Sequence, residues 1–102
     1  MYNKAFLIGN LTRDPELRYT QSGIPVCRFS LAVNRPPQKG QDAAQSTADF
    51  FNIVAWRRLA EVCGEYLKKG QPVCVEGRLQ IRPYEKGGVS RTMVEIVADT
   101  MQ

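Results

Sequence analysis

The sequence predicts an all-β fold, a five-stranded barrel with one α-helix between its third and fourth strands. Most of the apolar segments alternate with polar residues at the two-residue period of a strand. A single segment changes to the helical period, and turn-forming residues separate the segments from one another. A chain of 102 residues has room for one domain, 1–102, with one modest core.

The first half of the chain provides two strands. Residues 5–11 form a short apolar run bounded by polar residues, and residues 16–19 continue it beyond an Asp-Pro turn signal. Residues 24–33 form the second strand, in which apolar side chains recur at every second position from Cys27 to Val33. Such alternation is typical of an antiparallel strand with one exposed face.

A long loop over residues 35–47 follows the second strand. It has no apolar period, and loops of this length are usually functional or mobile. Arg35 and Lys39 make it a candidate flap over a polyanion, and a tolerated surface insertion is the alternative.

Residues 48–58 form the third strand and carry the functional argument. One face of the strand is an ordinary apolar core face that consists of Phe51, Ile53 and Ala55. The other face consists of Phe50, Asn52, Val54 and Trp56, followed at once by Arg57 and Arg58. Aromatic rings beside arginines are typical of a platform on which nucleic-acid bases stack while cations contact phosphates. The alternative is that Phe50 and Trp56 are buried on both sides.

The period changes after this strand. One apolar stripe of an amphipathic helix is formed by Leu59, Val62, Cys63, Tyr66 and Leu67. Gly70 ends the helix. Because one stripe indicates one surface to cover, we expect the helix to pack on the sheet and not to bind a partner.

Two more strands complete the chain. In the fourth strand, which begins at Pro72, the predicted core face extends to Leu79 and Ile81. The opposite face carries Arg78, Arg82 and Tyr84. A turn over residues 85–88, with Lys86 at its tip, leads to a last strand over residues 90–99. A five-stranded Greek-key barrel with its helix in this position is the OB-fold arrangement.

Composition and charge narrow the function further. The net charge of +4 and the pI near 9.2 permit an acidic partner. The chain has no histidine, and its three cysteines have no metal-site or disulfide spacing. We therefore expect no bound metal, no cofactor and no enzymatic activity. The sequence shows neither a signal peptide nor a run of about 20 apolar residues, which favours a cytoplasmic protein without a membrane segment.

Several short motifs occur in one order along the chain. They are Asn3-Lys4 before residues 8–19, Ala48-Asp-Phe50 with Trp56 beyond it, and residues 65–70 and 75–79. In this order, from Asn3 to Gln102, the chain resembles the bacterial single-stranded DNA-binding protein (SSB) family. The resemblance implies sequence-independent binding and protection of single-stranded DNA during replication, recombination and repair, in the bacterial cytoplasm at the nucleoid.

The resemblance also implies roles for individual residues. Family aromatics that stack on DNA bases match Phe50, Trp56 and Tyr84, and the cations beside them match Arg58, Arg82 and Lys86. We expect the same interface to include Lys4, Arg35, Asn52 and Arg78. Some members carry a further tryptophan in the loop after the second strand, where Pro36-Pro37 stands in this chain.

Assembly and partners follow from the same resemblance. The family is generally homotetrameric, and its dimers form through the edge of the first strand, which comprises Lys4, Ala5, Phe6, Leu7 and Ile8. Phe51 matches a position near subunit contacts, and core packing is the alternative. Family members continue into an acidic-hydrophobic tail that recruits replication and repair enzymes. This chain ends at Gln102, so we expect either a fragment or a member that lacks the tail.

Two other functions remain open at this point. A primosomal or RNA-binding relative would differ in its preference for DNA or RNA. An OB barrel that serves only as a protein-interaction module would use Phe50, Trp56 and Tyr84 as interface anchors, and would not bind oligonucleotides.

Overall fold

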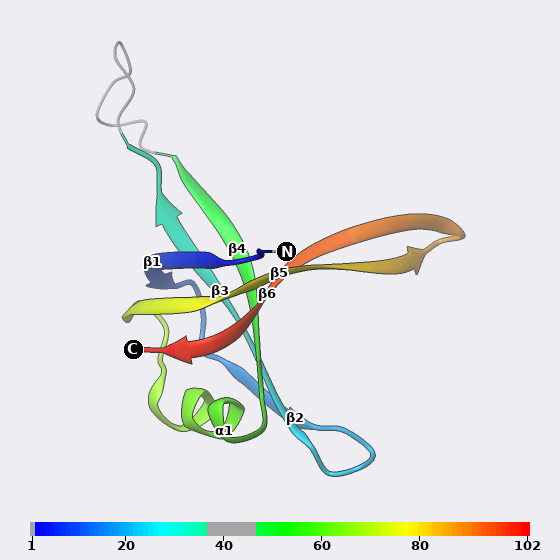
Figure 1. Cartoon of the computed structure of the whole chain (residues 1–102), viewed down its shortest axis with the longest axis horizontal. Coiled ribbons are helices and arrows are strands. Elements are labelled where there is room, and N and C mark those ends of the chain that lie inside the picture. Colours follow the sequence, from blue (N-terminus) through cyan, green and yellow to red (C-terminus); the bar gives the residue numbers. More distant parts are fainter. Residues whose placement is uncertain (1, 37–46) are drawn as a thin grey trace.

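The computed structural model of the chain describes residues 2–36 and 47–102 (Figure 1). Lys39 and most of the long loop therefore lie outside the described residues. The elements in chain order are β1 (Ala5–Leu11), β2 (Glu16–Tyr19), β3 (Pro25–Asn34), β4 (Ala48–Trp56), α1 (Arg57–Tyr66), β5 (Pro72–Lys86) and β6 (Val89–Met101).

The strands form one sheet that closes on itself. Its order is β1-β5-β6-β4-β3-β2, and β1 also pairs with β3, which closes the sheet into a barrel. All neighbours are antiparallel except β4 and β6, which pair in parallel. The predicted OB-fold, with its helix after the strand that ends at Trp56, is confirmed.

The predicted first strand consists of two pieces. Asn10 and Leu11 of β1 pair with β3, and so does all of β2, further along the same strand. Residues 12–15 interrupt the ladder between the two pieces. Two short elements thus occupy the place that the sequence assigned to one bent strand.

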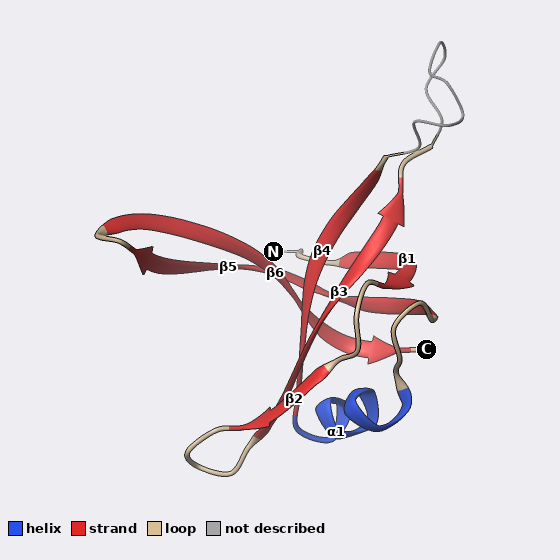
Figure 2. Cartoon of the chain, turned by 180° about the vertical axis from the view of Figure 1, so that it is seen from behind, coloured by secondary structure: helices blue, strands red, loops and turns tan. Residues whose placement is uncertain are grey.

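The core fills the inside of the barrel. Its buried residues come from alternate positions of the strands and from α1, which packs against β3 and β4 at one end of the barrel (Figure 2). They are Leu11, Cys27, Phe29, Leu31, Ile53, Ala55, Ala60, Cys63, Leu67, Val73, Val75, Ile96 and Ala98. Burial raises the pKa of Cys27 to about 11 and that of Cys63 to about 12, so both thiols stay protonated and act as packing groups.

The β5–β6 hairpin leaves the barrel at a β-bulge. The register between the two strands shifts between Glu76 and Gly77. A Cβ on Gly77 would lie 2.0 Å from the carbonyl oxygen of Val97, so only glycine fits this close approach. The side chain of Asn3 anchors the same point, because its amide donates to the carbonyl of Leu79 (2.8 Å) and accepts from the Leu79 amide (2.9 Å). Beyond this point the hairpin projects as an arm (Figure 1).

This arm overturns one prediction for the fourth strand. Leu79 and Ile81 are exposed, Ile81 to 66%, although the alternation placed both in the core. The reason is that the barrel interior ends at Gly77 and the arm has no layer packed on it. The turn is also tighter than predicted. Gly87 and Gly88 both have positive φ, while Lys86 pairs with Val89 instead of lying at the tip.

Candidate nucleic-acid interface

One surface of the barrel gathers most of the residues that the sequence singled out. We call it the outer face: the side of β3, β4, β6 and β5 that points away from the core. Two rows of cross-strand partners run across it, Arg28, Val54, Val97 and Arg78 in one and Ser30, Asn52, Glu95 and Gln80 in the next. Because cross-strand partners share a side of the sheet, side chains from four strands form one surface.

Two exposed aromatic rings lie on β4 within this surface. Phe50 is 69% exposed and Trp56 is 40% exposed, so neither is buried on both sides. They are six residues apart, which corresponds to about 20 Å along the strand. Val54 lies between them and, contrary to the alternation, is only 2% exposed; its neighbours across the sheet are Arg28 and Val97.

The position of Trp56 is set by the junction of β4 and α1. Trp56 has the extended backbone of an N-cap residue, and Arg57 adopts a φ of 60° that turns the chain into the helix. A hollow of about 400 Å³ lies beside the ring. Its lining consists of Ile24, Trp56, Arg57, Arg78, Val97, Ala98 and Asp99. A planar ring at the rim of such a hollow is suited to stacking with a flat ligand.

Tyr84 lies on the arm, on the same side of the sheet as Arg78 and Arg82. Arg91 stands directly opposite Tyr84 in the β5–β6 register, and both line an open hollow of about 440 Å³. The sequence analysis missed Arg91. The hairpin register is the signal that would have found it, because it determines which residue of β6 faces Tyr84.

Most of the predicted phosphate-binding cations pair with carboxylates. Arg35 donates to Asp49 Oδ1 from Nη2 (2.7 Å) and from Nε (2.9 Å), and these hydrogen bonds are the largest cause that lowers the pKa of Asp49 and raises that of Arg35. Arg78 Nη1 lies 3.3 Å from Asp99 Oδ1.

Lys4 and Arg82 follow the same pattern. Lys4 pairs with Glu76, whose hydrogen bond raises the pKa of the lysine. Arg82 Nε lies 3.7 Å from Glu95 Oε1. The outer face and its border therefore present cations that are already matched with acids.

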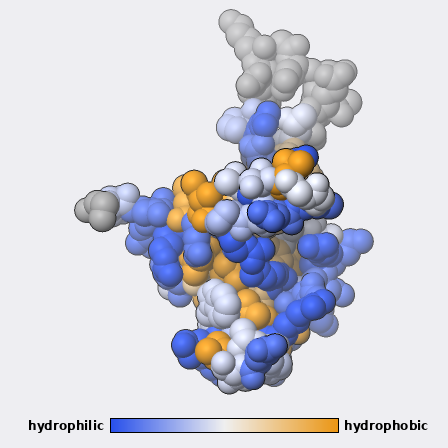
Figure 3. All heavy atoms as spheres, turned by 90° about the vertical axis from the view of Figure 1, so that its right-hand side faces the viewer, coloured by the Kyte–Doolittle hydropathy of each residue, from blue (hydrophilic) through white to orange (hydrophobic). Residues whose placement is uncertain are grey.

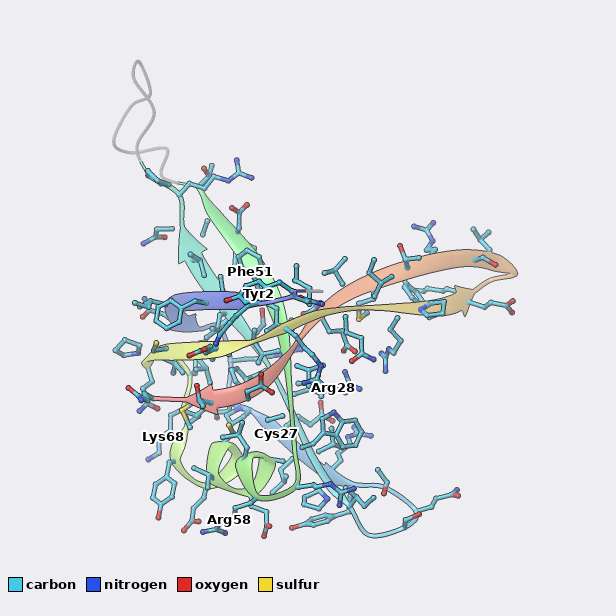
Figure 4. All side chains as sticks on the ribbon, in the orientation of Figure 1. Tyr2, Cys27, Arg28, Phe51, Arg58 and Lys68 are labelled. Carbon is cyan, nitrogen blue, oxygen red and sulfur yellow. The ribbon has the colours of Figure 1, made fainter. Side chains whose placement is uncertain are left out.

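Arg58 and Lys86 differ from these residues. Both are exposed, and neither takes part in the ion pairs found within residues 2–36 and 47–102. Arg58 points away from the barrel on the helix side (Figure 4), whereas Lys86 lies at the end of the arm. The structure therefore places one of these two predicted cations on the helix side of the barrel and the other at the end of the arm.

The centre of the outer face holds a cluster that the sequence analysis did not assign. Glu95 is 4% exposed and forms an ion pair with Arg28. The two residues help to line a half-open pocket of about 180 Å³, together with Arg13, Phe29, Asn52, Ile53, Arg82 and Met93. Glu95 lies on the outer face opposite Asn52 and Gln80, and its two arginine partners come from β3 and β5, so the cluster appears only with the sheet register.

Most of the predicted assembly residues lie on β1, and Lys4 directly precedes this strand. Phe6 and Ile8 point outward and are exposed, while Ala5 and Leu7 pack partly against the core. One edge of β1 pairs with β5 over Ala5 to Asn10, and the other edge pairs with β3 only at Asn10 and Leu11.

Phe51, the remaining predicted assembly residue, is on the opposite face of β4 from Phe50. It is half-buried and packs against the core. Its position is compatible with core packing, which the sequence analysis gave as the alternative to a subunit contact.

Comparison with known proteins identifies the family. Residues 2–102 match the profile of the single-strand binding protein family. The chain belongs to this family. The family match agrees with the order of motifs along the sequence and with the OB barrel.

Several curated relatives of this family are similar over the whole chain. A single-stranded DNA-binding protein of Oceanobacillus iheyensis is 48% identical over 103 residues, which cover 100% of this chain and 63% of the relative. The protein of the same name from Halalkalibacterium halodurans is also 48% identical over 103 residues, covering 100% of this chain and 60% of the relative. A third, from Fusobacterium nucleatum, is 46% identical over 100 residues, covering 98% and 65%. The chain thus spans less than two thirds of the length of these single-strand binding protein family members.

No group of three or more metal-ligating side chains occurs in the part of the chain that the structure describes. No helix in that part has the length and apolar character that crossing a membrane requires.

Proposed function

We propose that this member of the single-strand binding protein family binds single-stranded DNA without sequence preference, as a binding protein and not as an enzyme. The observation that carries the proposal is the presence of Phe50, Trp56 and Tyr84 on one outer face, interleaved with arginines. Stacking tolerates any sequence because every base has a π-face.

Binding of the DNA backbone would proceed by exchange of ion pairs. Arg35, Arg78 and Arg82 lie near carboxylates and remain partly exposed, so a phosphate can approach each guanidinium from the solvent side. An arginine has five N–H donors, and a carboxylate occupies only some of them. Arg58 and Lys86 would contact phosphates toward the two ends of the strand, while Lys4 and Asn52 would add polar contacts.

The proposal also covers assembly and location. The edge of β1 that faces away from β5 pairs with no strand from Ala5 to Gly9 among the described residues, and Phe6 and Ile8 are exposed beside it. An unpaired edge invites a second copy of the same strand, which would close it in an isologous contact. We expect a homotetramer in the bacterial cytoplasm, in which several outer faces raise avidity for a long strand.

A labelled homopolymer of deoxythymidine tests the binding proposal by fluorescence anisotropy. Trp56→Ala is expected to lose about 1–3 kcal/mol of binding free energy, since that is the range measured for stacking on an aromatic ring. Tyr66→Ala is the control, because Tyr66 is also an exposed ring, at 63% against 40% for Trp56, and lies on α1, away from the outer face.

Four outcomes would contradict the proposal. Equal losses in both variants would show that the outer face has no special role. An unfolded Trp56→Ala with unchanged affinity per folded molecule would make Trp56 a structural residue. Tighter binding of the matching RNA, or no binding of any oligonucleotide, would favour an RNA-binding relative or a protein-interaction module.

Sedimentation velocity tests assembly separately. The wild type is expected to sediment as an oligomer, and Ile8→Glu, which places a charge on the exposed side of β1, is expected to sediment as a smaller species. A wild type that is monomeric at micromolar concentration yet binds long strands tightly would refute the assembly proposal.

A further inference from the structure

Glu95 stands out because it is an acid in the middle of a surface proposed to bind a polyanion. Within residues 2–36 and 47–102 it is the charged residue that is buried, with 4% of its surface exposed. Taking a carboxylate out of water is costly unless its charge is matched and its oxygens accept hydrogen bonds. Its surroundings show how this cost is offset.

Two arginines share the Glu95 carboxylate, one at each oxygen. Arg28 Nη1 donates to Oε2, and Arg82 Nε lies 3.7 Å from Oε1. Arg28 comes from β3 and Arg82 from β5, so the carboxylate connects two strands across β4 and β6. Both arginine side chains remain 40–44% exposed, whereas the acid between them does not.

This arrangement presents cations to solvent and hides the anion beneath them. Two guanidinium groups and one carboxylate leave a net charge of +1, and Arg13 lines the same pocket. The cluster lies in the rows between Phe50 and Trp56, where a strand that stacks on both rings must pass. Figure 4 shows Arg28 beside β4, and Figure 3 shows hydrophilic and hydrophobic residues interleaved on the side toward which the arm projects.

We propose that Glu95 is a positioning residue: its buried carboxylate holds the guanidinium groups of Arg28 and Arg82 over the centre of the outer face, in place for phosphate. This inference rests on the proposed binding of single-stranded DNA and adds two residues, Glu95 and Arg28, to that site. A free arginine loses side-chain freedom when it binds a phosphate, whereas one that is already held loses less.

Neutralising Glu95 gives a result whose sign decides between two accounts. If only charge mattered, Glu95→Gln would remove a repelling anion and strengthen binding. Positioning predicts the opposite, a loss of about tenfold in affinity, because two guanidinium groups must then be ordered by the DNA itself. Glu85→Gln is the matched control, since it removes the same charge from an exposed acid that takes no part in the ion pairs of the described residues.

The experiment measures affinity for a deoxythymidine homopolymer per folded molecule, with thermal unfolding recorded for each variant. We expect Glu85→Gln to bind at least as tightly as the wild type and Glu95→Gln to bind about tenfold more weakly. In an Arg28→Gln background, Glu95→Gln is expected to lower the affinity by less than about threefold, because the two residues act through one contact. Side-chain ¹⁵N relaxation of Arg28 Nε is expected to show a mobile guanidinium in Glu95→Gln.

The outcomes separate this inference from the proposed function. A wild type that does not bind the homopolymer refutes the proposed function and this inference with it. If the wild type binds, two results refute the positioning role alone. One is an affinity of Glu95→Gln equal to that of Glu85→Gln, and the other is an equal loss of affinity from Glu95→Gln with and without Arg28→Gln. If Glu95→Gln does not fold, Glu95→Asp keeps the charge on a shorter side chain; a loss of about threefold supports the role and an unchanged affinity overturns it.

Discussion

The two faces of β4 are built from alternate residues of the same strand, yet they differ in almost every respect. Ile53 and Ala55 face inward and are fully buried among apolar neighbours, whereas Phe50 and Trp56 face outward and remain exposed. The inner face is continuous with a core that every strand of the barrel shares. The outer face instead combines rings, arginines and carboxylates, the side chains that the proposed binding of a polyanion with planar bases requires. We infer that stability and binding can be altered separately in this strand.

Truncation of the inner face is expected to give the largest effect. Ile53→Ala removes a side chain that is 1% exposed and should lower the free energy of unfolding by about 2–5 kcal/mol. Asn52→Ala, on the adjacent outward position, should change it by no more than about 0.5 kcal/mol. Urea denaturation of both variants measures the difference. Similar losses in the two would mean that the faces are not separable.

Truncation of the outer face is expected to affect binding and leave stability unchanged. Phe50→Ala should lose about 1–3 kcal/mol of affinity for single-stranded DNA, because one stacking ring is removed. Tyr19→Ala is the control, since Tyr19 is an exposed ring on β2 that lies outside the outer face. Titration calorimetry gives the affinities, and comparable affinities for the two variants would remove Phe50 from the interface.

The smallest expected effect is on the salt dependence of the affinity, and it differs between cations that form ion pairs and cations that do not. Arg58→Gln should lower the slope of log K against log salt by about 0.7, the value for one phosphate contact on a single strand. Arg35→Gln should lower it by less, because Arg35 is already paired with Asp49 in the free protein and releases fewer counterions on binding. Equal changes in slope would show that the ion pair does not persist in solution.

Alternation along the sequence separated the inner from the outer positions of β4, except that Val54, on the outer face, is only 2% exposed. It placed Phe50 and Trp56 outward and Ile53 and Ala55 inward, as the structure does. It failed for Leu79 and Ile81, because a periodic pattern shows that a strand has an apolar face but not whether another layer covers that face. The barrel interior ends at the bulge at Gly77, and the position of this bulge depends on contacts with β6.

The pairing of charges could not be predicted from the sequence. Arg28 and Glu95 are 67 positions apart and meet only because β3, β4 and β6 adopt one register. The same holds for Arg91 and Tyr84, which face each other across the arm. The sequence therefore predicted which kinds of residue lie on a face of a strand. The carboxylate or ring that each cation meets follows only from the pairing of the strands.

Trp56 emission offers the most direct test of the central claim, that the outer face binds single-stranded DNA by stacking. Trp56 is the one tryptophan in the chain, so its fluorescence reports on this surface alone. Titration with a deoxythymidine homopolymer at several salt concentrations is expected to quench the emission to saturation, with an affinity that falls as salt rises. Binding detected by anisotropy without any change in Trp56 emission would contradict the account, because the DNA would then lie elsewhere on the protein.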